Sequence, residues 1–305
     1  MYTSLDPKAL SQQEVHNYLI SAVAPRPICF ASTIDTNGRV NLSPFSFFNV
    51  FSSNPPIMIF SPARSGRDNT TKHTYDNVME VKEVTINIVN YPLVEQMSLA
   101  STAYDKGVNE FVKAGLTQIK SNIVKPPRVK EAPISFECKV NEVVPLGDSN
   151  GAGNLVICEV VMIHIQNQYL DEQNRLDTEK LDLVARMGGA WYARCNSESL
   201  FKISKPLQSK GIGVDSLPSH AQHSKVLTGN DLGRLGNAAR LPTEEELVSC
   251  KIKCIDPIYS ELEKVDVQEQ TARLHSLAQQ QLNAGKMISA LSILINTTVL
   301  IDGAT

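Results

Sequence analysis

Short apolar runs alternate with polar turns through the first part of the chain, which is the pattern of antiparallel β-strands. Residues 28–35 and 40–45 flank Thr36-Asn37-Gly38, a residue set typical of a tight hairpin turn. Further strands are predicted at residues 56–63, 84–90, 134–145 and 154–166. About six strands favour a closed or split β-barrel over an array of alternating strands and helices.

Helical spacing of apolar residues is weaker in the first part of the chain and dominates its end. Short helices are predicted at residues 12–18, 74–81, 93–101 and 107–114. Residues 210–241 are glycine-rich and polar, which indicates ordered loops, and Thr243 with Glu246 forms a capping box that opens a helix. Residues 255–285 and 286–299 continue as helices. We therefore predict a mainly β barrel domain at 1–207 and, at 208–305, a glycine-rich connector with a helical C-terminal extension.

Composition describes an ordinary soluble globular protein, with 42% hydrophobic residues and a formal net charge of -3. No basic run or stripe favours a nucleic-acid partner. The apolar stretch at residues 287–295 is too short to span a bilayer. The first fifteen residues lack a basic segment followed by an apolar one, so a cytoplasmic protein is expected.

The six cysteines do not form a disulfide framework. Three of them lie in apolar strand runs, where they behave as small buried hydrophobes in a reducing compartment: Cys29, Cys138 and Cys158. Cys250 and Cys254 lie one helical turn apart and could form half of a metal site. No second closely spaced pair completes such a site, so no metal centre is predicted.

An unusual mixture of polar and aromatic residues follows the predicted hairpin. Hydroxyl and amide side chains at Ser43, Ser46, Asn49, Ser52, Ser53 and Asn54 are interleaved with Phe45, Phe47, Phe48 and Phe51. An apolar core does not require this mixture. It suits a flat aromatic ligand whose edges carry hydrogen-bonding groups.

A polar loop at residues 64–71 leads into the helix predicted from Thr74. Free backbone N–H groups and the positive end of the helix dipole converge at such a junction, so it favours an anion. Arg64, Arg67 and Lys72 add fixed positive charge there. The alternative is a solvated polar loop in which Thr74 only caps the helix.

Ordered sequence matches extend this pattern over roughly the first two thirds of the chain. They are Arg26-Pro27, Ser32-Thr33, Asp35, Gly38, residues 41–49 (NLSPFSFFN), Pro55-Pro56, Ser61-Pro62, Lys72-His73-Thr74, Asn77-Val78, residues 124–129, Ala132-Pro133, Phe136-Glu137-Cys138 and Arg186-Met187-Gly188-Gly189. In these matches the chain resembles the flavin reductase-like family, FMN-binding split-barrel proteins that include flavoredoxins. The resemblance implies FMN as cofactor.

The resemblance also implies where FMN would lie. Its phosphate is assigned to Ser61, Arg64, Ser65, Arg67, Lys72 and Thr74. The remaining cofactor-binding residues, several of them around the isoalloxazine ring, are Arg26, Ser32, Thr33, Asn41, Ser43, Phe45, Ser46, Phe47 and Asn49. Because successive strand residues point to opposite faces, about half of the strand residues in this second set must face away from the ligand.

The family implies a homodimer with flavin at the subunit interface, and reduction of FMN by NAD(P)H before electrons pass to free flavin, oxygen or a partner. Gly153-Asn154-Leu155 stands where many flavin reductases carry Gly-Asp-His, which weakens the case for rapid NAD(P)H turnover. A flavoredoxin-like electron carrier is therefore the alternative, and a barrel that has lost its flavin is a third. No catalytic residue is predicted.

Overall fold

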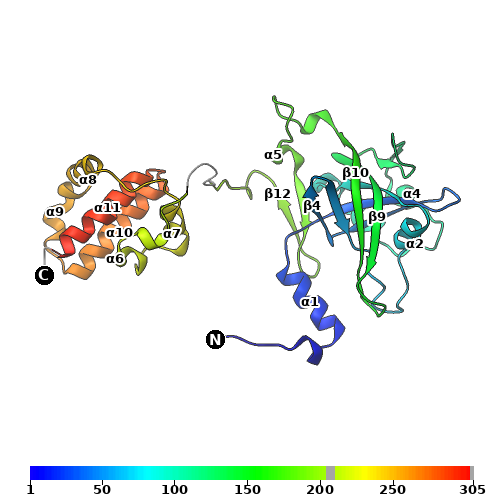
Figure 1. The fold of residues 1–305 in the computed structure, drawn as a ribbon, viewed down its shortest axis with the longest axis horizontal. Helices are drawn as coiled ribbons and strands as arrows, with labels where there is room; N and C mark the ends of the chain where they lie inside the picture. The colour runs from blue at the N-terminus through cyan, green and yellow to red at the C-terminus, as the bar shows by residue number, and fades with distance from the viewer. Residues whose placement is uncertain (204–209, 303–305) are drawn as a thin grey trace. The chain divides into compact units, whose positions relative to one another are not determined.

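The protein consists of two compact units, Met1–Phe201 and Lys202–Thr305, in a computed structural model that describes residues 1–203 and 210–302 (Figure 1). The predicted domain boundary between residues 207 and 208 lies outside the described residues. Each unit is described below by itself.

The main sheet of the first unit has seven antiparallel strands, in the order β3-β2-β6-β9-β10-β5-β4. Its strands are β2 (Cys29–Ile34), β3 (Val40–Phe45), β4 (Phe48–Ser53), β5 (Pro56–Phe60), β6 (Glu83–Ile88), β9 (Ile134–Pro145) and β10 (Asn154–Ile165). Figure 1 shows β9 and β10 as its two long neighbouring strands. Strand β4 was not expected, because its polar residues break the alternation that marks a half-buried strand.

The hairpin between β2 and β3 forms as predicted. The carboxylate of Asp35 accepts hydrogen bonds from the backbone N–H groups of Asn37 and Arg39, each at 2.9 Å. Gly38 has a φ of 79°, a conformation that costs glycine little. The turn sets the register that pairs Cys29 with Phe45. It thereby fixes which side chains of β3 face the site described below.

Two short sheets and several helices complete the first unit. The sheets contain β1 (Arg26–Pro27), β11 (Leu183–Arg186) and β12 (Tyr192–Cys195), and β7 (Gln118–Ile119) with β8 (Arg128–Val129). The helices are α1 (Gln12–Ala22), α2 (His73–Glu80), α3 (Val94–Ala100), α4 (Glu110–Ala114) and α5 (Thr178–Leu181). Strand β2 separates two apolar cores, since Phe30 packs in one while Cys29 and Ala31 pack in the other. This alternation follows from the two-residue period of a strand.

The second unit is helical, as predicted for the C-terminal extension. Its helices are α6 (Ser219–Gln222), α7 (Gly229–Gly236), α8 (Glu244–Cys250), α9 (Asp256–Leu262), α10 (Val267–Asn283) and α11 (Met287–Asp302), with a π-helical turn η5 (Lys251–Ile255) between α8 and α9. In α11, residues Ala290 to Leu294 are fully buried. Among the described residues, no helix is long and apolar enough to cross a membrane.

The prediction of ordered loops over residues 210–241 is only partly correct, because two helices interrupt the loops and the segment belongs to the helical unit. This segment contains α6 and α7, and Leu217, Ala221 and Leu235 pack in the same core as α10 and α11. Its glycines permit close backbone packing, because a Cβ on Gly211 would collide with the carbonyl oxygen of Gly236. The glycine content therefore reflects tight packing inside the helical unit.

Candidate functional site

A cavity of about 740 Å³ lies in the first unit between β3, the loop before α2, the loop after α3 and the start of α4. Four cationic side chains line it: Arg64, Arg67, Lys72 and Lys106. Among the described residues, none of these four makes a salt bridge. Their charge therefore remains available to an anionic ligand.

The first turn of α2 adds further groups that favour an anion at the cavity. Lys72 occupies the N-cap position, and no side chain caps this helix. The neighbouring Thr71 hydroxyl donates to Asp76 instead, at 2.8 Å. The helix start thus offers backbone N–H groups and a positive dipole end to a ligand, beside cationic side chains.

The loop before α2 is held in shape by its own side chains. Arg64 donates through Nε to Oδ1 of Asn69 and through a terminal nitrogen to the Asn69 carbonyl, both at 2.7 Å. Asn69 has a φ of 60°, and its amide donates to the Asp148 carbonyl at 2.9 Å. The Arg64 guanidinium is therefore fixed at the cavity wall before any ligand arrives.

One acidic side chain in this loop is already satisfied. Hydrogen bonds from the hydroxyls of Ser65 and Thr70 lower the pKa of Asp68 to about 2. The Thr70 hydroxyl lies 2.8 Å from the carboxylate. Asp68 is thus a permanent anion engaged by its own loop, and it offsets part of the positive charge nearby.

A buried carboxyl group forms another part of the cavity wall. Glu110 accepts a hydrogen bond from the backbone N–H of Leu42 at 2.9 Å. The Asn41 amide is best satisfied when it donates to Glu110 at 3.3 Å and accepts from the Thr74 hydroxyl at 2.9 Å. Burial raises the pKa of Glu110, partly offset by the Leu42 N–H and by the charge of His73. Glu110 therefore ties α4 to β3 at the cavity, and Asn41 ties β3 to α2 through Thr74.

The predicted site residues divide according to this cavity. Those that line it are Asn41, Ser43, Arg64, Ser65, Arg67 and Lys72. Thr74 lies directly behind it, fully buried and bonded to Asn41. Sequence reasoning thus assembled most of the predicted phosphate set at one place.

Other predicted residues lie away from the cavity, inside the fold. Ser32 and Thr33 are fully buried in β2, where Thr33 accepts from the Asn77 amide at 3.1 Å. Phe45 packs in the core against Phe60, with ring centroids 5.2 Å apart. The Ser61 hydroxyl accepts from the Asn154 backbone at 3.1 Å. These side chains support the fold around the site.

Arg26 also has a structural partner set. Its guanidinium is buried and donates to the carbonyls of Ile20, Val23 and Met187, the last two at 2.7 and 3.0 Å. It therefore joins the end of α1 to the turn that follows β11. Ser46, Phe47 and Asn49 lie partly or largely exposed at the corner between β3 and β4, outside the cavity lining.

Sequence reasoning missed one wall of the cavity, which comes from residues 101–106 and Glu110. The available signal was Glu110 itself, an acidic residue in the short run GVNEF that otherwise reads as a helix start. Lys106 and Tyr104 carry no local pattern that marks them. They reach the site only because α3 and α4 fold back onto β3.

Comparison with known proteins agrees with this fold. A family model described as "Flavin reductase like domain" matches residues 21–180. An uncharacterized protein of Aquifex aeolicus is 38% identical over 189 residues, which are 62% of this chain and 94% of the relative. The matched part thus corresponds to nearly the whole of that relative.

Two solved structures resemble the same part of the chain. Nitrilotriacetate monooxygenase component B from Bacillus cereus has a TM-score of 0.62 and 27% identity, covering 67% of this chain and 99% of that one. A protein with a split barrel domain from Shewanella frigidimarina has a TM-score of 0.55 and 27% identity, covering 65% and 95%.

The antiparallel sheet and its helices therefore define a split-barrel protein, as predicted from the sequence. The chain belongs to the flavin reductase-like family.

Proposed function

We propose that this protein is an FMN-binding oxidoreductase that uses NAD(P)H to reduce its flavin. The observation that carries the proposal is the cavity in which an uncapped helix start meets four cationic side chains. A phosphate dianion needs several donors and positive charges at one place, and this arrangement supplies them. The family relationship supports a flavin as the molecule that carries the phosphate.

The residues present fit FMN. Arg64, Ser65, Arg67, Lys72 and the first backbone N–H groups of α2 would hold the phosphate. Ser43, Phe47 and Asn49 would hold the ring, Phe47 with an apolar surface and the other two with polar groups. Glu110 would position Asn41 and Thr74 behind the phosphate without touching it.

Bound FMN would supply the redox chemistry, accepting a hydride from NAD(P)H and passing its electrons to free flavin, oxygen or a partner protein. The protein's own contribution is binding and orientation. Asn41 and Ser43 present hydrogen-bonding groups on β3, whose register is fixed by the Asp35 turn. The cationic loop would offset the phosphate charge and so hold the cofactor in one orientation.

A flavoredoxin-like electron carrier is the second candidate, and one observation favours it. Asn154, at the position where many flavin reductases have Asp, is buried and donates to Ser61 Oγ and to the Pro62 carbonyl, at 3.1 and 2.9 Å. Leu155 follows it where those enzymes have His. The segment therefore joins β10 to the loop after β5 and offers no imidazole to a nicotinamide.

Anaerobic stopped-flow mixing distinguishes these two functions. The FMN-loaded protein is mixed with NADH or NADPH while flavin absorbance is followed. Rapid bleaching by either nucleotide supports the reductase. An absence of bleaching by both, with full bleaching by dithionite, identifies an electron carrier.

We further propose that the protein acts as a homodimer in the cytoplasm. Val50 and Phe51 on the edge strand β4 are 60% and 64% exposed, and Phe47 beside them is 41% exposed. An apolar edge of this kind suits a second copy of the chain. All six cysteines are free, which suits a reducing compartment. Size-exclusion chromatography with light scattering should give twice the chain mass, and Phe51→Lys should shift it toward the monomer.

A further inference from the structure

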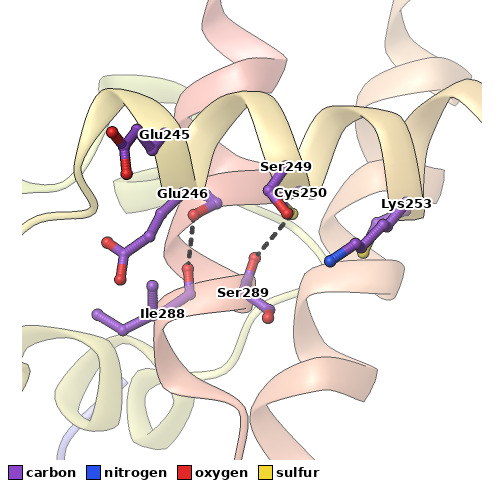
Figure 2. A pocket seen from close by; sticks show the side chains of 9 residues that line it. Glu245, Glu246, Ser249, Cys250, Lys253, Ile288 and Ser289 are labelled. Carbon is purple, nitrogen blue, oxygen red and sulfur yellow. Dashed lines mark hydrogen bonds between the residues drawn. The ribbon is translucent and has the colours of Figure 1, made fainter.

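A second cavity, of about 300 Å³, lies in the helical unit between α8, η5 and the start of α11 (Figure 2). Its chemistry differs from that of the flavin site. The polar and sulfur-bearing groups that line it include Glu246, Ser249, Cys250, Lys253, Cys254 and Ser289. The proposed flavin function uses none of these residues.

The chain deforms its helix at this point. Pro257 lacks a backbone N–H, so the carbonyl of Lys253 loses its usual partner four residues ahead. The backbone instead forms a π-helical turn at η5, in which the Asp256 N–H donates to the Lys251 carbonyl. A π-helix usually occurs as a single turn within an α-helix, and often at a functional site. Here the turn lies directly after Cys250 and contains Cys254.

The two thiols face the same cavity and contact each other. Cys250 is 7% exposed, and its thiol donates to the Ser289 carbonyl at 3.6 Å. Figure 2 shows this contact between α8 and α11. Burial and the hydrogen bond with Cys254 raise the pKa of the Cys250 thiol to about 12. Cys254 is partly exposed, so the pair is open to solvent on one side.

The compartment decides which chemistry suits the pair. In the reducing compartment proposed above, the two thiols stay reduced and no direct sulfur–sulfur bond forms. Reduced thiols that lie side by side are ligands for a single metal ion, because the thiolate is the form of cysteine that binds metals. The pair therefore favours one bridging metal ion over a disulfide.

The donor set decides the kind of metal. Among the described residues, no group of three or more His, Cys, Asp or Glu side chains gathers as a metal site, so a tetrahedral zinc centre has no support. Two thiolates alone suit a soft cation that accepts two ligands, and Cu(I) is the soft ion that such ligands select.

We propose that Cys250 and Cys254 bind one soft monovalent cation of the Cu(I) class as a two-coordinate thiolate site. Both S–H bonds break, two sulfur–metal bonds form, and two protons leave to solvent with no change in oxidation state. The product carries one negative charge, which Lys253 on the same cavity wall offsets.

The test is anaerobic titration of the full-length protein with Cu(I), in competition with a chromophoric Cu(I) chelator. We expect one Cu(I) per chain. Cys250→Ser and Cys254→Ser should each weaken binding by about a hundredfold or more, because one thiol alone loses the advantage of paired ligands. Cys195→Ser, which removes the partly exposed thiol of the other unit, is the matched control and should change nothing.

A second measurement uses the unaltered chain. Cu(I) should protect the partly exposed Cys254, but not Cys195, from alkylation by iodoacetamide, as read by peptide mass spectrometry. Equal alkylation with and without Cu(I), or stoichiometric binding that survives in the double variant Cys250→Ser/Cys254→Ser, would overturn the proposal. So would a chain that binds no Cu(I) and loses two hydrogens on mild oxidation, since that identifies a disulfide pair. None of these outcomes depends on flavin binding.

Discussion

Lys72 carries the most specific residue-level expectation, because it stands at the uncapped start of α2 on the cavity wall. A charge-assisted hydrogen bond to phosphate contributes roughly 1.5–3 kcal/mol. Lys72→Ala should therefore weaken FMN binding by about tenfold to a hundredfold, while riboflavin, which lacks phosphate, should be almost unaffected. Fluorescence titration with both ligands measures this difference.

Lys82→Ala is the matched control, since Lys82 is exposed beyond the far end of the same helix. It should leave both affinities unchanged. An equal loss of FMN and riboflavin affinity in Lys72→Ala would show a damaged fold, and no loss of either would remove Lys72 from the phosphate site.

Two variants of Glu110 distinguish the effect of its charge on FMN binding from its structural role. Glu110→Gln removes a negative charge near the proposed phosphate while keeping an acceptor for the Leu42 N–H, so FMN affinity should rise by roughly threefold to tenfold. Glu110→Ala leaves that buried N–H without a partner and should lower the free energy of unfolding by about 1–3 kcal/mol. Urea denaturation and FMN titration of both variants measure this. Weaker FMN binding in a stable Glu110→Gln protein would contradict the assigned role.

The cationic loop could be predicted because its residues adjoin one another in sequence and precede a helix. Glu110 and Lys106 could not be placed there, since their contacts with β3 arise from tertiary folding. Phe45 is a residue that the sequence placed at the ligand although it lies in the core. Its neighbours suggested a ring contact, but a strand sends alternate side chains to opposite faces, and Phe45 faces the core.

At the scale of single helices and strands, sequence patterns predicted the structure well where the interacting residues are close in sequence. The capping box predicted at α8 is present, with the Glu246 carboxylate accepting from the Thr243 N–H at 2.8 Å. The helical spacing predicted over residues 255–285 is divided between α9 and α10, with Asp266 capping the second. Pro257 and the capping residue Asp266 indicate helix ends in this segment. The spacing of apolar residues alone does not show where a helix ends.

Removing the cap of α8 should have a measurable cost. Thr243→Ala deletes the hydroxyl that accepts from the Glu246 N–H at 3.3 Å, and should destabilise the helical unit by about 1 kcal/mol. Thr271→Ala, within α10, is the control and should change stability by about 0.5 kcal/mol at most. Thermal unfolding followed by circular dichroism compares them. Equal melting temperatures for Thr243→Ala and the parent would show that the cap contributes nothing.

A buried histidine should make the stability of the helical unit depend on pH. His275 is 2% exposed and lies 2.7 Å from the Ser224 hydroxyl and 2.8 Å from His220. Because Ser224 Oγ already accepts two backbone N–H groups, its own hydrogen points to Nδ1 of His275, which is therefore neutral. Burial, with a contribution from His220, lowers the pKa of His275 from 6.5 to about 4.

The sign follows from which state binds the proton first. Between about pH 6.5 and pH 4 the unfolded chain is protonated at His275 while the folded chain is not, so the free energy of unfolding falls by about 3 kcal/mol over this window. Urea denaturation at pH 7.5 and pH 5 should show the loss, and the exposed His223→Gln variant should retain it. Identical stability at both pH values would contradict a neutral buried His275.

At the scale of the whole molecule, the sequence indicated a barrel followed by helices, and the seven-stranded sheet and the helical unit agree with this. The glycine-rich segment was misplaced because glycine permits both loose linkers and close packing, and only tertiary contacts distinguish them. No pattern in the chain itself names the electron acceptor. That choice depends on surfaces and partners outside a single chain.

Binding of FMN and riboflavin to the purified full-length protein tests the central claim most directly. We expect one FMN per chain, with a dissociation constant for FMN at least about tenfold below that for riboflavin, because in the proposed site the phosphate would meet Arg64, Arg67, Lys72 and the start of α2. Equal affinity for the two ligands, or no binding of either, would show that the cavity before α2 is not a flavin phosphate site.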